Sequence, residues 1–241
     1  MRYLELTLPR PEENLALDEI LLRRVNGGEA PETLRVWESP RHFVVLGVSQ
    51  SLAEHVHEAA CVADGVPVLR RCSSGGCVLQ GPGCLNYTLV LRYENHPGTE
   101  GIRPSYQYVL QRIATAMKAY GVDARLCGIS DLAAGDLKFS GNAQKRLKDA
   151  FMQHGTLLHG LETSLMGKYL KEPDDRPGYR GSRAHGEFVA SLALDEIQLR
   201  AILKSAFEID ARQAGLSPSD MKDLTQLVCE KYATPEFIRR R

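Results

Sequence analysis

Apolar runs of two different periods alternate along the chain at uneven spacing, and this pattern restricts the fold more than any other feature. Segments 33–37, 43–47 and 67–71 are strand-like, whereas 105–120 repeats apolar residues at helical spacing. Further strand-like segments follow at 131–134, 137–140 and 150–158, and Gly135-Asp136 can turn the first into the second. The pattern predicts an α+β fold, with a mixed, largely antiparallel β-sheet covered by helices on one face.

The same reasoning predicts the remaining elements. We expect a strand at 4–8, a helix at 11–25, a short helix after Ser51 and a strand at 86–91. Segment 172–188 is rich in proline, glycine and charge, which predicts a loop. Two helices should follow it, around 199–207 and 221–232, and Ser217 with Asp220 should cap the second.

The composition argues against several classes of protein. A chain of 241 residues can bury one core, so we expect a single domain. Lysine plus arginine equal aspartate plus glutamate at 30 each, which predicts no general attraction to nucleic acid or to anionic membrane. The chain has neither the apolar centre of a signal peptide nor a run near the roughly 20 apolar residues of a membrane span. The six cysteines are therefore expected to be reduced thiols of a cytoplasmic protein.

A loop of small residues, in the segment LRRCSSGGCVLQGPGCLNY (69–87), joins two predicted strands. Its backbone N–H groups could approach an anion, and Arg70 and Arg71 would supply forked donors. The composition also fits a glycine-rich hairpin with solvated arginines. Cys72 and Cys77 are spaced like half a zinc site, but no second pair accompanies them, so no metal site is predicted. Neither GxxxxGK[ST] nor GxGxxG opening a helix is present, which leaves the common nucleotide-binding loops without support.

A second polar region, DLKFSGNAQKRLKDAFMQHGTLL (136–158), begins with Lys138 and ends with His154-Gly155-Thr156. A lysine among backbone dipoles can bind a phosphate or an acyl carbonyl and can stabilise developing negative charge. Taken singly, Lys138 also fits an exposed strand lysine, and His154 a structural histidine.

Together the two regions resemble the lipoate-protein ligase and lipoyl/octanoyl transferase family, within the biotin/lipoate protein ligase catalytic-domain superfamily. The family patterns R-R-x-[ST]-G-G-x-x-V, an Asn-Tyr strand, N-D-[LI], K-[IVF]-S-G-[NS]-A-Q and H-H-G-[ST]-L-L are similar to 70–78, 86–87, 130–132, 138–144 and 153–158. Segments 14–19, 34–37 and 177–188 extend the likeness over nearly the whole chain. The sequence departs from the family at Ser74 and Cys77, and at Gln80-Gly81-Pro82-Gly83, where His-Asp or His-Glu is commoner.

The resemblance implies a reaction and a set of site residues. The reaction is the activation of lipoate or octanoate with ATP and Mg²⁺ to an acyl-adenylate, followed by transfer to a lysine of an acceptor lipoyl domain. Lys138 would bind the phosphate or carbonyl, and Asp131 would orient a metal, ATP or the incoming lysine. The implied substrate and nucleotide contacts are Arg70, Arg71, Ser73, Gly75, Gly76, Val78, Asn86, Gly141, Asn142, Gln144, His154, Gly155 and Thr156. Among them, 141–144 would shape the adenine side and 154–156 the floor of the pocket.

Two alternatives remain open at this point. The same family includes thiol-dependent transferases, and Cys127 is the candidate nucleophile for that chemistry. A non-catalytic lipoyl-binding protein or partner subunit is the other alternative. The implied partners are an acceptor such as a glycine cleavage H-like protein or a 2-oxoacid dehydrogenase E2, and a possible separate accessory subunit. Residues 1–241 would then form one catalytic domain without a separate C-terminal accessory domain.

Overall fold

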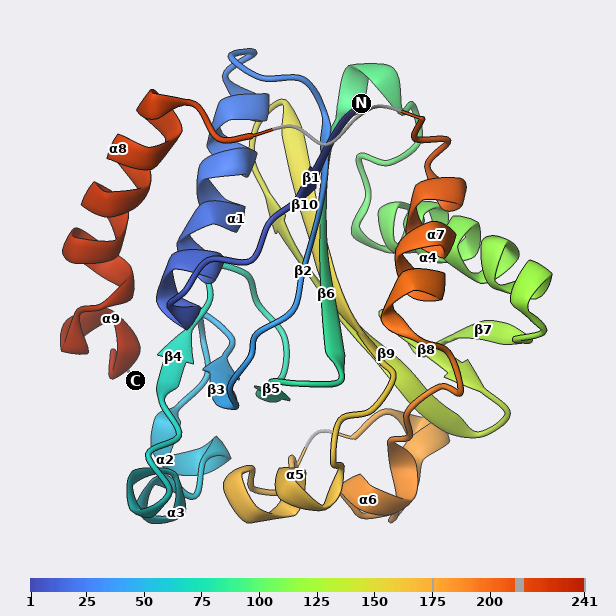
Figure 1. The fold of residues 1–241 in the computed structure, drawn as a ribbon. Helices are drawn as coiled ribbons and strands as arrows, with labels where there is room; N and C mark the ends of the chain where they lie inside the picture. Colours follow the sequence, from blue (N-terminus) through green and yellow to red (C-terminus); the bar gives the residue numbers. More distant parts are fainter. Residues whose placement is uncertain (175, 211–214, 241) are drawn as a thin grey trace.

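A seven-stranded sheet forms the centre of the computed structural model, which describes residues 1–174, 176–210 and 215–240 (Figure 1). Its strand order is β1-β2-β6-β10-β9-β8-β7. The first pair is parallel and all the others are antiparallel, which confirms the prediction of a mixed, largely antiparallel sheet. The strands are β1 (Arg2–Glu5), β2 (Thr33–Trp37), β6 (Cys84–Arg92), β7 (Ala124–Cys127), β8 (Asp131–Ala134), β9 (Leu137–Arg146) and β10 (Ala150–Leu158).

A smaller three-stranded sheet carries the glycine-rich segment. It consists of β3 (Phe43–Leu46), β4 (Val68–Arg70) and β5 (Val78–Gln80), with β3 in the middle. Strand β5 lies within the stretch that the sequence predicted as a loop, and β7 was not predicted at all. Because both strands are short and flanked by polar residues, their apolar alternation is too brief to be recognised.

Helices cover both faces of the large sheet, so the prediction of one covered face is wrong. Helices α1 (Pro11–Asn26) and α8 (Pro218–Leu227) lie on one side, and α4 (Ile102–Met117) and α7 (Glu196–Ala206) lie on the other (Figure 1). On β6, Leu89 and Leu91 pack towards α4, whereas Val90 packs towards α1. The strand is therefore apolar on both faces, as is typical of a strand buried between two layers.

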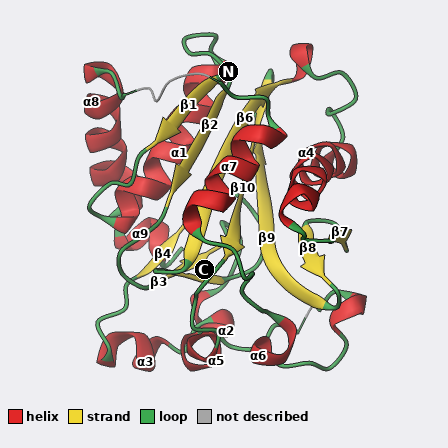
Figure 2. Ribbon diagram, turned by 45° about the vertical axis from the view of Figure 1, so that its right-hand side comes forward, coloured by secondary structure: helices red, strands yellow, loops and turns green. Residues whose placement is uncertain are grey.

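Short helices gather below the two sheets (Figure 2). These are α2 (Leu52–His55), α3 (Glu58–Ala63), α5 (Ser164–Tyr169) and α6 (His185–Phe188). Segment 172–188 is thus only partly a loop, since it also contains the 3₁₀ turn η3 (Gly178–Arg180). The other short elements are η1 (Tyr93–Asn95), η2 (Lys118–Tyr120), the π-helical turn η4 (Val228–Tyr232) and α9 (Pro235–Ile238).

The predicted helices and caps agree with the structure at most positions. Ser51 caps α2, and Ser217 and Asp220 form the expected reciprocal cap of α8, with N···O distances of 3.1 and 3.0 Å. Helix α4 begins at Ile102 and its last turn becomes the 3₁₀ helix η2. Within the described part of the chain, every helix is too short or too polar to cross a bilayer.

Arg70 ties the C-terminal segment to the glycine-rich loop. Its side chain is fully buried, and its guanidinium donates to the carbonyls of Phe237 and Ile238 at 2.9 and 2.7 Å. It also donates to the carbonyls of Gly47 and Gln50 at 2.8 and 2.7 Å. Arg70 was predicted to contact substrate, but in the structure it contacts backbone carbonyls and lines neither of the cavities described below.

We expect Arg70→Met to lower the free energy of unfolding by about 2–4 kcal/mol, because several buried carbonyls would lose their donor. Urea unfolding followed by circular dichroism would measure this change. Arg103→Met, at an exposed position of α4, is the control and should change stability by no more than about 0.5 kcal/mol. Equal stabilities of the two variants would contradict the proposed tie.

Candidate active site

Two adjoining cavities open between the glycine-rich loop and the large sheet. The inner cavity has a volume of about 170 Å³ and the outer cavity about 230 Å³. They share a set of lining residues at their junction: Gly76, Cys77, Val78, Asp131, Lys138, Gly141 and Thr156. The sequence had predicted all of these as site residues except Cys77.

Lys138 reaches this junction through a shift in strand register. Leu132 of β8 pairs with Ser140 of β9, but the next residue, Ala133, pairs with Lys138 and not with Phe139. Opposite residues of paired strands point to the same face, so the shift places Lys138 on the face of Asp131. In a regular ladder Lys138 would oppose Ala134 and point to the other face.

Asp131 is bonded on both carboxylate oxygens. Lys138 Nζ lies 2.8 Å from Oδ1, and the Tyr179 hydroxyl donates to Oδ2 at 2.8 Å. Burial, followed by the charge of Asp131, raises the pKa of Tyr179 well above its usual value, so the hydroxyl remains a donor. An added Cβ on Gly141 would lie 3.1 Å from both Cε and Nζ of Lys138, so the glycine leaves room for the lysine. Tyr179 belongs to a segment that resembled the family, but sequence reasoning gave it no role.

Arg71 holds the glycine-rich loop in its folded shape. Its guanidinium donates to Ser73 Oγ at 3.0 Å and to the carbonyls of Ser74 and Gly76, each at 2.9 Å. Gly75 adopts a φ of +102°, which a residue with a side chain rarely adopts. Arg71 lines the inner cavity, but much of its donor capacity is used by the loop itself.

A buried hydrogen-bonded chain supports this loop from α1. Asp18 accepts from Arg35 at 2.7 Å, and its other oxygen lies 3.4 Å from His154 Nδ1. His154 Nε2 lies 2.5 Å from Ser73 Oγ. Burial alone would raise the pKa of Asp18, but Arg35 and His154 outweigh it and the pKa is lowered. Ser73 is fully buried and lines neither cavity, so its predicted substrate contact is not supported.

A second buried chain runs along the sheet beneath the inner cavity. The Tyr87 hydroxyl lies 2.5 Å from Asn142 Oδ1, and Gln153 donates to Tyr87 at 3.1 Å. Gln144 donates to Gln153 at 2.8 Å and accepts from Ser105 at 3.0 Å. Asn142 lines the inner cavity, whereas Gln144 lines neither cavity. Gln144, which was predicted to shape the adenine side, orients the Gln153 amide in the structure.

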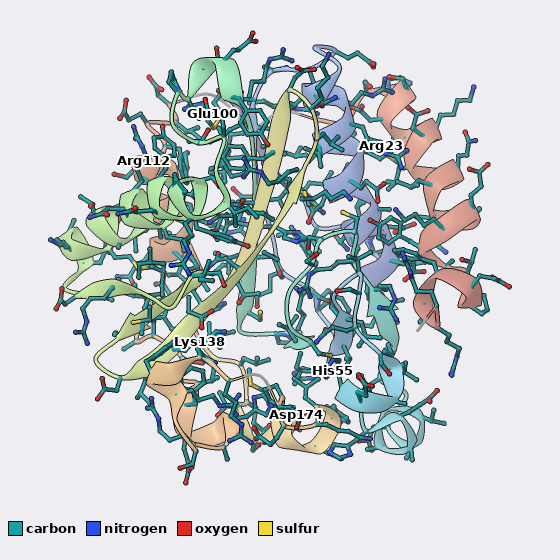
Figure 3. The ribbon with its side chains drawn as sticks, turned by 180° about the vertical axis from the view of Figure 1, so that it is seen from behind. Arg23, His55, Glu100, Arg112, Lys138 and Asp174 are labelled. Carbon is teal, nitrogen blue, oxygen red and sulfur yellow. The ribbon has the colours of Figure 1, made fainter. Side chains whose placement is uncertain are left out.

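The outer cavity combines apolar walls with basic side chains. Leu79, Leu158, Met166, Leu170, Phe188 and Val189 form its apolar lining, and His55, Lys171, Arg180 and His185 add the basic groups. In the lower part of Figure 3, Lys138 lies on one side and His55 on the other, and Asp174 lies beneath them. The start of β9 is clamped against the segment after α6, because Ala190 N donates to the Lys138 carbonyl at 2.9 Å.

Cys127 lies at the edge of the site, outside both cavities. It is the last residue of β7 and pairs with Asp131 of β8. Strand β8 therefore lies between Cys127 and the strand that carries Lys138. Burial raises the pKa of its thiol, and Arg125 offsets this only in part, so the reactive thiolate is disfavoured. Burial also raises the pKa of Cys72 and of Cys77 to about 12. Among the described residues, no group of three or more His, Cys, Asp or Glu could hold a metal ion.

The structure brings most of the predicted residues together. Those that line the inner cavity are Arg71, Gly75, Gly76, Val78, Asn86, Asp131, Lys138, Gly141, Asn142, His154, Gly155 and Thr156. Asp18 and Trp37 also line it but were not predicted as site residues. Asp18 could have been found, because a carboxylate on the apolar face of a predicted helix requires a buried partner.

The family model and the curated relatives that match this chain agree on one family. A family model described as the lipoyl protein ligase A/B catalytic domain matches residues 10–202. Lipoate–protein ligase 1 of Staphylococcus aureus is 27% identical over 233 residues, covering 93% of this chain and 68% of the relative. Octanoyltransferase LipM of Moorella thermoacetica is 25% identical, covering 100% of this chain and 98% of the relative. The chain spans about half the length of several other curated lipoate-protein ligases.

Solved structures share the fold. A bi-partite lipoate protein ligase of Thermoplasma acidophilum superimposes with a TM-score of 0.86 at 23% identity, covering 99% of this chain and 95% of that chain. A lipoate-protein ligase A crystallised with ATP superimposes with a TM-score of 0.85 at 23% identity, covering 99% and 98%. At this identity the likeness concerns the architecture, which confirms the predicted biotin/lipoate ligase type of fold.

We expect Gly155→Ala to lower the free energy of unfolding by about 1–3 kcal/mol. An added Cβ would lie 1.8 Å from Asn142 Oδ1, so Asn142 would have to move away from Tyr87. Thermal unfolding would measure the loss. Gly76→Ala is the matched control, because no atom lies within 4 Å of its added Cβ. If both variants were as stable as the wild type, the close packing of Asn142 on Gly155 would be refuted.

We expect the contribution of Asp18 to stability to depend on pH. Its pKa in the folded state lies below the usual 3.8, so its charge stabilises the fold at neutral pH and this contribution is lost as pH falls through the folded pKa. Asp18→Asn should cost about 3 kcal/mol at pH ~7 in urea unfolding, and the difference from wild type should shrink near pH ~3. Asp123→Asn, at an exposed position, serves as control. A difference that stayed constant over this pH range would argue against the ion pair.

Proposed function

The chain belongs to the lipoyl protein ligase A/B catalytic-domain family, and we propose that it is an ATP-dependent lipoate-protein ligase. It activates lipoate, or octanoate, as an acyl-adenylate and transfers the acyl group to a lysine of an acceptor lipoyl domain. One observation carries the proposal. The Lys138 ammonium group stands where two cavities of different chemistry meet.

The chemistry of each cavity suggests its substrate. The outer cavity carries His55, Lys171, Arg180 and His185 beside apolar walls, which suits the phosphates and the flat base of a nucleotide. The inner cavity is smaller, and its lining includes the apolar side chains of Leu15, Trp37 and Val78 beside several polar groups. An acyl chain fits this second environment, with its carboxylate at Lys138.

The reaction then proceeds in two steps, adenylation of the acid and transfer of the acyl group. A carboxylate oxygen attacks the α-phosphate of ATP, the bond to the β-phosphate breaks and pyrophosphate leaves. The amine of the acceptor lysine attacks the acyl carbonyl, AMP leaves with the electrons of the broken C–O bond, and the amine loses a proton. Lys138 stabilises the negative charge that develops in both steps. Asp131 and Tyr179 keep its ammonium group at the junction.

The described residues offer no preformed site for Mg²⁺. Asp131 is the carboxylate that lines both cavities, and both of its oxygens are already bonded. Mg²⁺ commonly binds through substrate phosphates and water with few protein carboxylates. We therefore assign the ion only as the counter-ion of ATP, and no step depends on it here.

The names of similar proteins support the proposal. Lipoate-protein ligase is the name of several curated relatives, and one similar structure was solved with ATP. The bi-partite ligase of Thermoplasma acidophilum was studied with an E2 lipoyl domain, which suggests the class of acceptor. We propose that residues 1–241 form one catalytic domain.

A thiol-dependent octanoyltransferase is the second candidate, because relatives named LipM match as much as the whole chain. That reaction would pass the acyl group from a carrier thioester to Cys127 and then to the acceptor lysine. The raised pKa of Cys127 and its place outside both cavities favour the ligase.

Mass spectrometry of the acceptor distinguishes these possibilities. Purified protein would be incubated with lipoate, Mg²⁺-ATP and an apo lipoyl domain, and in parallel with an octanoylated carrier protein without ATP. An ATP-dependent mass gain supports the ligase. A gain only from the carrier, abolished by Cys127→Ala, would instead establish the transferase. If the acceptor gained no mass in either incubation, the remaining possibility would be a non-catalytic lipoyl-binding protein or partner subunit.

We expect Lys138→Met to lower kcat/KM for ATP-dependent lipoylation by about 10²–10³-fold, because developing charge would lose its positive partner. Lys148→Met is the matched control, since this lysine is exposed beyond the end of β9. A Lys138→Met enzyme as active as the control would overturn the assignment of Lys138.

A further inference from the structure

The C-terminal segment, which we define as residues 215–240, packs behind the glycine-rich loop. Its helix α8 and its π-helical turn η4 lie against α1, and α9 lies against β4 (Figure 1). The family model matches residues 10–202, so this segment lies beyond the matched range. Turns of π-helix are rare and occur frequently at functional positions. Through Tyr232, the last residue of η4, the segment reaches the glycine-rich loop.

Tyr232 is anchored to α1 by a buried carboxylate. Its hydroxyl donates to Glu19 Oε2 at 2.6 Å, and Lys231 Nζ donates to the same oxygen at 2.7 Å. Burial alone would raise the pKa of Glu19, but Lys231 and Tyr232 outweigh it and the pKa is lowered. The Tyr232 ring packs edge-on against Phe237, with 5.4 Å between the ring centroids. The tyrosine is therefore held at both its hydroxyl and its ring.

Cys72 of the glycine-rich loop lies against this tyrosine. Both side chains are buried in the same apolar cluster, where Cys72 is 4% exposed and Tyr232 is 1% exposed. Burial raises the pKa of the Cys72 thiol, and a hydrogen bond with the Tyr232 hydroxyl acts in the opposite direction. The thiol therefore lies next to the hydroxyl that Glu19 holds.

Side chains alternate along the chain that leaves β4. Backbone hydrogen bonds of residues 71 and 73 continue the pairing with the segment of β3, so the chain stays extended. Successive residues of an extended chain point to opposite sides. Arg70 and Cys72 face the C-terminal segment, whereas Arg71 and Ser73 face the loop and β10. The residues that shape the loop thus alternate with residues that the C-terminal segment holds.

We propose that Tyr232 is a positioning residue for substrate binding. It fixes Cys72, and thereby Arg71 and Ser73 on either side, which hold the loop in the shape that lines both cavities. This inference rests on the proposed function and adds a role for the C-terminal segment. Because the loop lines both cavities, its displacement weakens the binding of the acid and of ATP together. The ion pair between β8 and β9 keeps its position, so the chemical step is retained.

Steady-state kinetics of lipoylation test this proposal. Tyr232→Phe removes the hydroxyl and keeps the ring. We expect it to raise KM for lipoate and KM for ATP about fivefold each, as for the loss of one hydrogen bond, and to change kcat by less than about twofold. Tyr120→Phe, at an exposed position of η2, is the control and should change none of these constants.

Thiol labelling with N-ethylmaleimide gives a second readout, which requires no acceptor. Cys72 is covered in the wild type, so its peptide should be labelled about fivefold faster in Tyr232→Phe, as measured by mass spectrometry. Cys61 is 1% exposed and belongs to a different buried cluster, so its labelling should keep the wild-type rate. Saturating lipoate and Mg²⁺-ATP should slow the labelling of Cys72 in the variant, because they bind the ordered loop.

Three outcomes would overturn the inference. Unchanged KM values would mean that the loop does not depend on Tyr232. A lower kcat with unchanged KM values would place the effect on the chemical step. Equal acceleration of labelling at Cys61 and Cys72 would indicate a general loss of stability.

Failure of the proposed function would look different. In that case the wild type would modify no acceptor, and the labelling comparison would decide alone. Faster labelling of Cys72, with Cys61 unchanged, would support the tie between Tyr232 and the loop. Equal rates for Cys72 in the wild type and in Tyr232→Phe would refute it.

Discussion

The ion pair between Lys138 and Asp131 depends on a one-residue shift between two neighbouring strands. Without that shift Lys138 would point to the opposite face of the sheet, and the junction of the two cavities would keep the Asp131 carboxylate without its positive partner. Gly141 provides the space for the lysine side chain, and Tyr179 holds the second oxygen of the carboxylate. The position of the Lys138 ammonium group is thus fixed by the register of β8 and β9, by the lack of a side chain at Gly141 and by the distant residue Tyr179.

Buried polar chains stabilise the surroundings of this pair. Burying an arginine costs free energy unless its donors are bonded. Arg70 meets this requirement with carbonyls of the C-terminal segment, Arg71 with carbonyls of its own loop and Arg35 with Asp18. These bonds connect α1, the glycine-rich loop and the C-terminal helices. The loop is therefore preorganised, although its many small residues would leave an isolated segment flexible.

The same bonds show where three residues predicted to contact substrate lie in the structure. Arg70, Ser73 and Gln144 were expected to contact substrate because of their types and positions in motifs. In the structure Arg70 donates to carbonyls of the turn after β3 and of the C-terminal segment. Ser73 bonds Arg71 and His154 within the glycine-rich loop and beneath it, and Gln144 orients Gln153. Arg70 and Arg71 are adjacent in a chain that leaves β4, so their side chains point in different directions. A motif gives the residue types but not which side of the loop each side chain takes.

The sequence by itself determined the α+β class, the long helices, the β8–β9 hairpin and the two segments that carry the site, because apolar periodicity and turn residues are local properties. Through family resemblance it also gave Lys138 and Asp131 as the expected catalytic residues, although not the ion pair between them. Only the tertiary structure decided that helices cover both faces, that Tyr179 bonds Asp131 and that two cavities meet at Lys138. These features depend on contacts between residues far apart in the chain, and such contacts follow from packing, which no local pattern encodes.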